Sequence, residues 1–144
     1  MNGGQTGTHL TYLRRDGDGK ADLPKEYQRE CRGVIRGGAI RLAEHAPDAE
    51  LIIGEGVEST FSAMQLFGLA GWAAVSASGL KTMELPPDVR RIIIAADNDT
   101  SGAGQRASLG AYDRWRAEGR QVCIKTPPVI GTDFNDLLFN TRAR

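Results

Sequence analysis

The stretch ELIIGEGVEST, residues 50–60, decides the fold, because it joins a buried strand to a helix through an acidic turn. Leu51, Ile52 and Ile53 run without a polar interruption, which is typical of a strand that is covered on both faces. The run ends at Glu55, which stands between two glycines. Because glycine permits unusual backbone angles and close approach, Glu55 is predicted to be open to a ligand at the end of its strand.

The residues after this stretch repeat the alternation of strand and helix. Three further apolar runs follow, at residues 71–77, 90–97 and 120–126. Helical patterns lie between them at 57–68 and 101–119, and a shorter one precedes Pro86. Alternation of this kind predicts an α/β fold, with a parallel four-stranded sheet and helices on both faces. The expected strand order, 2-1-3-4, places the first and third strands side by side.

The first 46 residues have a different character. THLTYLRR, residues 8–15, alternates between apolar and polar side chains and is followed by DGDGK, which predicts a tight turn. The run GVIRGGAIRLA, residues 33–43, predicts one or two more strands. We therefore interpret residues 1–46 as a small β-rich lead-in segment and residues 47–144 as a separate α/β domain.

Composition excludes several classes of function. The 144 residues carry 18 Lys or Arg and 18 Asp or Glu, so the strongly basic surface of a duplex-binding protein is not expected. Cys31 and Cys123 form no CxxC pair, and His9 and His45 are isolated, so a zinc site is not favoured. Such cysteines indicate thiols in a reducing cytoplasm. No apolar run approaches the roughly 20 residues that span a bilayer, so no membrane partner is expected.

Acidic side chains also follow the third predicted strand, which ends in Asp97, Asn98 and Asp99. If the strand continues, Asp97 and Asp99 point to the same side. Carboxylates that lie close together repel one another, and a hard divalent cation relieves the repulsion. Oxygen ligands favour Mg²⁺ first and Mn²⁺ next. A plain turn is the alternative for these residues alone, but a neighbouring Glu55 favours a metal site.

A third acidic block, GTDFNDLLF, follows the last strand and contains Asp133 and Asp136. Asp133 has two interpretations, as the N-cap of a short helix or as a neighbour of the metal or nucleotide. The same choice applies to Glu58, at the start of the first helix. Lys81 is a candidate for contact with phosphates, although a solvated surface charge is the simpler interpretation.

The three blocks IIGEG, AADNDTSG and GTDFNDLL together resemble the Toprim domain. This is the catalytic domain shared by bacterial-type primases, type IA and type II topoisomerases and some nucleases. The resemblance covers roughly residues 50–139 and is closest to primases of phages and mobile elements. The lead-in, which ends in GGAIRLAE, also resembles the segment before the Toprim domain in those primases.

The resemblance implies a role for each acidic residue. Glu55, Asp97 and Asp99 are expected to be catalytic and to hold Mg²⁺, with Mn²⁺ as a substitute. Asp133 and Asp136 are expected near a metal or the nucleotide phosphates.

One position departs from the family pattern. Replicative primases usually have Asp four residues after the key glutamate, where this chain has Ser59, with Glu58 one residue earlier. A secondary metal contact is therefore in question at this position.

The resulting hypothesis is a primase-type nucleotidyltransferase that makes RNA primers from NTPs on single-stranded DNA. A primase normally also has a zinc-binding module, so the chain is interpreted as part of a larger enzyme, with a replicative helicase as a possible partner. Two alternatives stay open: a Toprim-type nuclease, and a non-catalytic module that binds nucleotide or DNA.

Overall fold

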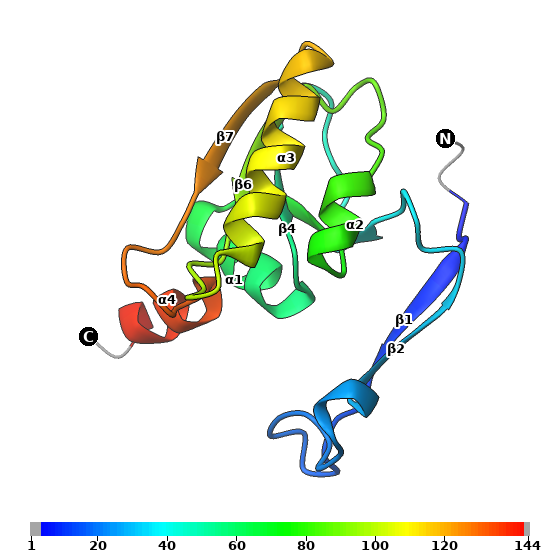
Figure 1. The fold of residues 1–144 in the computed structure, drawn as a ribbon, viewed down its shortest axis with the longest axis vertical. Coiled ribbons are helices and arrows are strands. Elements are labelled where there is room, and N and C mark those ends of the chain that lie inside the picture. The colour runs from blue at the N-terminus through cyan, green and yellow to red at the C-terminus, as the bar shows by residue number, and fades with distance from the viewer. Residues whose placement is uncertain (1–3, 143–144) are drawn as a thin grey trace. The chain divides into compact units, whose positions relative to one another are not determined.

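The computed structural model describes residues 4–142 (Figure 1). The chain divides into two compact units, Met1–Arg36 and Gly37–Arg144. The acidic blocks singled out above all belong to the second unit. None of the helices among the described residues is long and apolar enough to cross a membrane.

The first unit is a two-stranded antiparallel hairpin. Its elements are β1 (Gly7–Thr11), a short 3-10 helix η1 (Lys25–Tyr27) and β2 (Arg29–Gly33). The predicted DGDG turn is present, because the amide of Asp18 donates to Asp16 Oδ1 over 2.9 Å. The second strand ends at Gly33, where the sequence pattern had predicted that a strand begins.

The second unit is built on a five-stranded sheet of order β3-β5-β4-β6-β7. Its strands are β3 (Ile40–Arg41), β4 (Glu50–Gly54), β5 (Ala70–Ala73), β6 (Arg91–Ala95) and β7 (Gln121–Lys125). The last four are parallel and confirm the predicted order, with β4 between β5 and β6. β3 is an additional edge strand, antiparallel to β5, and it comes from the segment interpreted as lead-in.

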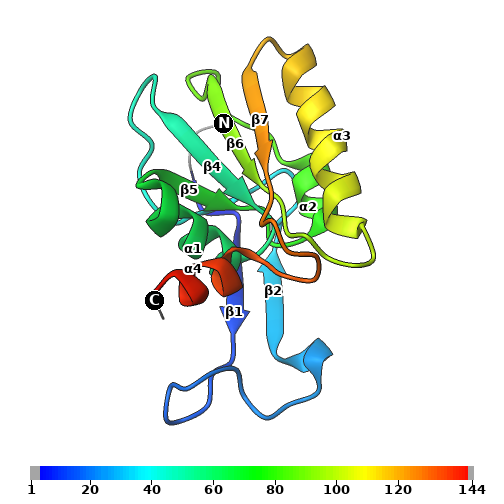
Figure 2. The same cartoon turned by 90° about the vertical axis from the view of Figure 1, so that its left-hand side faces the viewer.

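Helices cover both faces of this sheet, as predicted. They are α1 (Val57–Phe67), α2 (Ala77–Thr82), α3 (Ala103–Ala117) and α4 (Phe134–Arg142). Figure 2 shows α2 and α3 on one side and α1 and α4 on the other. Alternate residues of β4 feed the two cores, since Leu51 and Ile53 pack in the α2/α3 cluster and Ile52 packs in the α1/α4 cluster.

The two long helices use different residues to meet the sheet. In α3, Ala107, Ala111 and Trp115 are completely buried, as their four-residue spacing predicts. In α1, Phe61 and Phe67 keep 43% and 39% of their surface exposed. The apolar stripe of α1 (Val57, Phe61, Met64 and Phe67) therefore does not form its buried face.

Small side chains form that buried face instead: Ser59, Thr60, Ser62 and Ala63. The cause is the close approach of α1 to the end of β4. A Cβ atom built on Gly54 would lie 2.3 Å from Thr60 Oγ1. Only a glycine in the strand and a small residue in the helix fit this crossing, which brings the start of α1 against the carboxyl end of the sheet.

We predict that Gly54→Ala destabilises the protein by about 1–3 kcal/mol, because the added methyl group overpacks the crossing. Thermal unfolding followed by circular dichroism measures this. The matched control is Gly110→Ala on α3, where an added Cβ meets nothing within 4 Å and helix propensity predicts a gain of up to about 1 kcal/mol. Equal melting temperatures for the two variants would contradict the crossing geometry.

Candidate metal centre

Glu55 lies immediately after β4, at the carboxyl end of the sheet, and is half-buried. The carboxylate of Glu55 accepts a hydrogen bond from the backbone N–H of Ala77, the first residue of α2, and this bond lowers the pKa of Glu55. The pKa of Glu55 is nevertheless raised, first by burial and then by the charges of Asp97 and Asp99. Glu55 is thus a carboxylate that holds its proton more tightly than a free glutamate does.

Asp97 follows the neighbouring strand β6 and is held by α1. Ser59 Oγ donates a hydrogen bond to Asp97 Oδ1 over 2.6 Å, and Ser59 itself is buried. Burial is the largest cause of the raised pKa of Asp97, and the charges of Asp133, Asp99 and Asp136 add to it. The bond from Ser59 works in the opposite direction and stabilises the charged form.

Asp99 has the opposite electrostatic environment. Its carboxylate accepts hydrogen bonds from Ser101 Oγ and, over 3.1 Å, from the backbone N–H of Gly104 in the first turn of α3. These bonds lower the pKa of Asp99, that of Ser101 most. Asp99 is therefore charged at neutral pH.

Gly104 leaves a space that two of these carboxylates share. A Cβ atom built there would lie 3.0 Å from Asp99 Oδ2 and 3.7 Å from Glu55 Oε2. Residues from β4 and β6 are thereby brought to one point beside the start of α3. Among residues 4–142, no group of three or more His, Cys, Asp or Glu side chains already has an arrangement that could hold a metal ion.

The donor chemistry of this space fits a hard divalent cation. All the side-chain ligands on offer are carboxylate oxygens, which is the type that Mg²⁺ and Mn²⁺ prefer. The raised pKa values of Glu55 and Asp97 reflect charge that is not fully compensated by the protein. A bound cation would supply that compensation.

The third acidic block has a structural role that the sequence had left open. Asp133 Oδ1 accepts the amide N–H of Asp136 over 2.9 Å, and Asp136 Oδ2 accepts the amide N–H of Asp133 over 3.1 Å. This reciprocal pair is a capping box at the start of α4. Both carboxylates still raise the pKa of Asp97, so the block caps a helix and adds to the acidic cluster.

The remaining candidates lie on α1 and α2. Lys81 is exposed in the last turn of α2, whereas Ala77, at the opposite end of that helix, meets Glu55. Ser59 stands four residues after Glu55, where replicative primases usually have Asp, and it contacts Asp97. The neighbouring Glu58 has its Oε2 atom 3.9 Å from where a Cβ atom on Gly56 would lie. Ser59 therefore holds the carboxylate of Asp97 in place through its hydroxyl group.

Sequence reasoning missed three residues of the site: Ser59 as a donor, Gly104 as a spacer and Asn98 as a bonding partner of the third block. Ser59 had one readable signal, because a small polar residue stands on the helix directly after the key glutamate. The roles of Gly104 and Asn98 depend on contacts between segments that the sequence does not specify.

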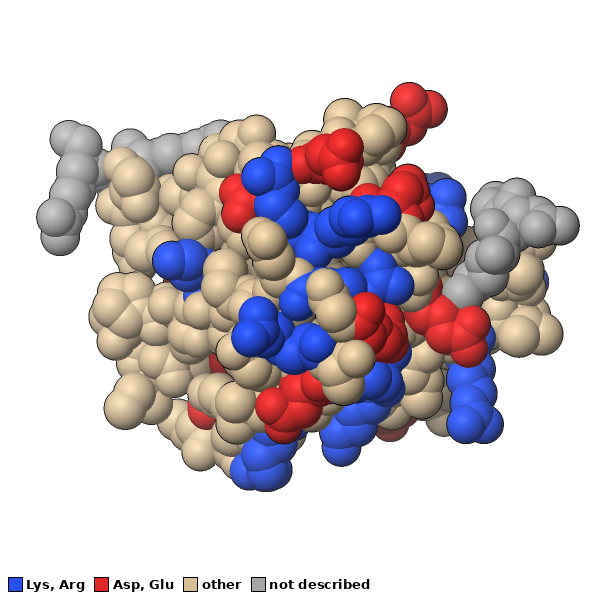
Figure 3. Space-filling model, turned by 90° about the horizontal axis from the view of Figure 1, so that it is seen from above, with Lys and Arg blue, Asp and Glu red and all other residues tan. Residues whose placement is uncertain are grey.

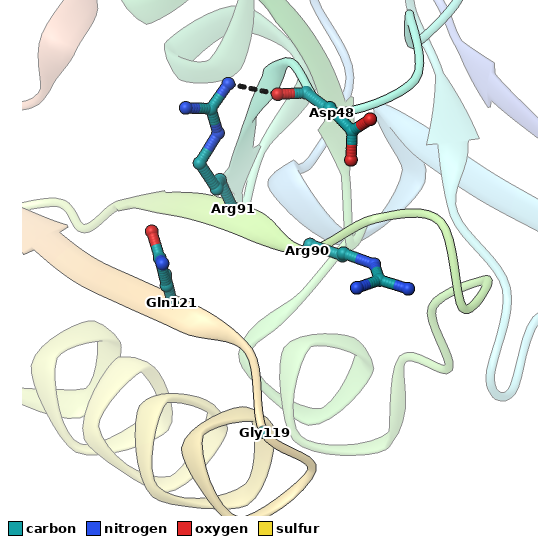
Figure 4. A pocket seen from close by; sticks show the side chains of 5 residues that line it. All are labelled: Asp48, Arg90, Arg91, Gly119 and Gln121. Atoms are coloured by element: carbon teal, nitrogen blue, oxygen red, sulfur yellow. Dashed lines mark hydrogen bonds between the residues drawn. The ribbon is translucent and has the colours of Figure 1, made fainter.

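The opposite end of the strands offers a different surface. A hollow of about 360 Å³ there is lined by Asp48, Arg90, Arg91, Gly119 and Gln121 (Figure 4). Arg91 donates a hydrogen bond to the backbone carbonyl of Asp48. The face seen from above in Figure 3 intersperses Lys and Arg with Asp and Glu. Its charge is mixed, and the concentrated carboxylates belong to the other end of the sheet.

Comparison with known proteins identifies the family and the fold. The family model of the Toprim domain matches residues 50–143, and the chain belongs to this family. The crystal structure of a DNA primase domain from Pseudomonas aeruginosa superimposes with a TM-score of 0.60 at 18% sequence identity. That match covers 87% of this chain and 44% of the other, and it shows a shared fold. A search of curated proteins gave no significant match.

We predict that Asp97→Asn raises the melting temperature at neutral pH by about 4 °C, or roughly 1 kcal/mol. The raised pKa means that ionising Asp97 costs folding free energy. Protonated Asp97 contributes fully to the free energy of unfolding below the ordinary Asp pKa of about 3.9. This contribution is lost as pH rises through the raised pKa that Asp97 has in the folded protein. Asparagine keeps the oxygen that accepts from Ser59 and removes the charge.

Thermal scans across pH without divalent ions measure this effect, with the exposed Asp113→Asn on α3 as the control. The gain from Asp97→Asn should disappear as pH falls below the raised pKa of Asp97, because wild-type Asp97 is then protonated in the folded protein. A gain that is independent of pH, or equal in the control, would contradict the electrostatic cause.

A second prediction concerns the shared space. Gly104→Ala should weaken Mg²⁺ binding by about tenfold, since the methyl group would lie 3.0 Å from Asp99 Oδ2. Calorimetric titration measures the affinity, and Gly110→Ala on the same helix should leave it unchanged. Wild-type affinity in Gly104→Ala would show that the ion does not use this space.

Proposed function

We propose that this chain is the catalytic Toprim domain of a primase, which joins NTPs into RNA primers on single-stranded DNA in the cytoplasm. The observation that carries the proposal is the space at Gly104, which Glu55 and Asp99 share near the half-buried Asp97. Toprim domains generally bind Mg²⁺ through acidic residues, and the family is established for this chain. Likeness in fold to a DNA primase domain favours primer synthesis among the family's activities.

Glu55, Asp97 and Asp99 are the residues that would hold Mg²⁺, with Mn²⁺ as a substitute. The ion supplies charge neutralisation at the phosphate oxygens and makes the attacking hydroxyl group more acidic. Asp99 enters the reaction as a charged ligand because its pKa is lowered. Ser59 keeps Asp97 fixed in one orientation through its hydrogen bond. The carboxylate of Asp97 would therefore need little rearrangement to bind the ion.

Glu55 is the proposed proton acceptor. Its half-buried carboxylate borders the space at Gly104 and would be in position to accept a proton there. As the proton of the primer 3′ hydroxyl passes to Glu55, the oxygen forms a bond to the α-phosphorus and pyrophosphate leaves with the electron pair of the broken P–O bond. Asp133, Asp136 and Lys81 are proposed to lie near the triphosphate, with Lys81 as the cationic contact.

The test is primer synthesis on a single-stranded DNA template with labelled NTPs and Mg²⁺ or Mn²⁺. Wild-type protein should make short RNA that chelation with EDTA abolishes. Asp99→Asn should lower the rate by about 100-fold or more, because it removes a charged ligand, while the exposed Asp113→Asn keeps full activity. Because the chain spans 44% of the primase domain that it resembles, the assay should also use the full-length protein, with and without a replicative helicase.

The same carboxylates would serve hydrolysis if water took the place of the hydroxyl group, so the assay also resolves the nuclease alternative. Metal-dependent cutting of the DNA without RNA synthesis would replace the primase proposal by a nuclease. If full-length Asp99→Asn protein keeps wild-type activity, the domain is a binding module and catalysis lies elsewhere.

A further inference from the structure

We propose that Asn98 is a positioning residue, which latches the loop of residues 126–132 onto the end of β6 and so sets the third acidic block beside Asp97. The inference deepens the proposed function, since it concerns how the acidic blocks are assembled around the divalent ion. It rests on the hydrogen bonds of one residue that stands between the two aspartates of the second block.

The backbone of Asn98 bonds to the far end of the loop. Its N–H donates to Thr132 O over 3.0 Å, and its C=O accepts the N–H of Gly131 over 2.6 Å. These two bonds form an isolated antiparallel bridge between residues 98 and 132. The last bond from the regular β6–β7 pairing, Ala96 N–H to Lys125 O, lies before the loop. The chain therefore leaves the sheet after β7 and is brought back to it at Asn98.

The side chain of Asn98 bonds to the near end of the loop and to α3. Its Nδ2 donates to Pro127 O over 2.9 Å. Its Oδ1 accepts from Gln105 Nε2 over 3.2 Å, and the same Nε2 lies 3.3 Å from Asp99 O. The side-chain amide thus joins the near end of the loop to the first turns of α3, while the backbone of the same residue holds the far end.

Apolar burial does not hold the middle of this loop. Val129 and Ile130 keep 60% and 74% of their surface exposed. The ordered position of this loop therefore depends more on its hydrogen bonds to Asn98 than it would if the loop were packed in the core. The loop runs directly into Asp133, so its position is transmitted to the acidic block.

The helix that follows the loop has its own anchors. Phe134 is 1% exposed in the core, and Ser62 Oγ donates to Asn135 Oδ1 over 3.1 Å. Loss of the latch should therefore leave α4 docked and displace mainly Asp133 at its start. This separates positioning of the acidic block from general stability of the fold.

Asparagine is the residue type that this position requires. The site needs a donor toward Pro127 O and an acceptor for Gln105 Nε2 on one short planar group. Aspartate has no donor and would add a third negative charge between Asp97 and Asp99. Alanine removes both bonds without adding charge, which makes it the cleaner test.

The experiment compares wild-type protein, Asn98→Ala and the control Ser62→Ala by NMR, with circular dichroism to verify folding. Mn²⁺ at low occupancy should broaden the amide signals of Gly56, Gly104, Asp133 and Asp136 in wild-type protein. In Asn98→Ala, broadening at Asp133 and Asp136 should fall at least about twofold relative to Gly56 and Gly104. Without metal, amide exchange at Gly131 should quicken by about fivefold. Ser62→Ala, which removes a different bond to α4, should leave both readouts unchanged.

Unchanged broadening ratios in Asn98→Ala, or unchanged exchange at Gly131, would overturn the latch. If Asn98→Ala does not fold, Gln105→Leu removes the bonds of Gln105 Nε2 to Asn98 Oδ1 and Asp99 O but keeps the bond from Asn98 to Pro127 O, and it should show the same pattern with a smaller amplitude. Absence of Mn²⁺ broadening anywhere in wild-type protein would count against the proposed function instead. The latch is then decided without metal, by the Gly131 exchange rate and by nuclear Overhauser contacts across the bridge between residues 98 and 132.

Discussion

The cost of burying neighbouring carboxylates at one end of a parallel sheet is the constraint on which this structure depends. Parallel pairing of β4 with β6 places Glu55 and Asp97 at neighbouring strand ends. Their raised pKa values record the cost of bringing such charges into a half-buried space. The protein offsets part of that cost with neutral donors, namely the first N–H groups of α2 and α3 and the hydroxyl group of Ser59. A bound divalent cation would offset the remaining cost.

The fold makes room for this arrangement with small residues. Gly54 lets α1 cross close to the end of β4, and that crossing brings Ser59 to Asp97. Gly104 lets the start of α3 approach Asp99 and Glu55 together. A site that contains uncompensated charge and close backbone approach is less stable than an apolar core would be, which is the usual relation between stability and function at catalytic sites.

Much of this could be predicted from the sequence, because strand and helix periodicity and the ends of strands are local features. The places of Glu55, Asp97 and Asp99 at strand ends could be predicted, since each follows an apolar run. The strand order could be predicted because the strands alternate with helices along the chain. The run of residues 33–43 predicted strand structure and β3 lies within it, but two residues carry too little pattern to give the bounds of this strand or its partner. The buried face of α1 was also missed, since its apolar stripe suggested packing that the close crossing at Gly54 prevents. Hydrogen bonds of Ser59 and Asn98 depend on tertiary contacts, which no spacing rule contains.

The most direct test of the central claim is a Mg²⁺ titration of the isotope-labelled wild-type protein, observed by NMR at the side-chain carboxyl carbons. The account predicts one saturable set of shifts at Glu55, Asp97 and Asp99, with the exposed Asp113 unaffected. Shifts of similar size at all carboxyl groups, or no saturable change at any of these three, would contradict it.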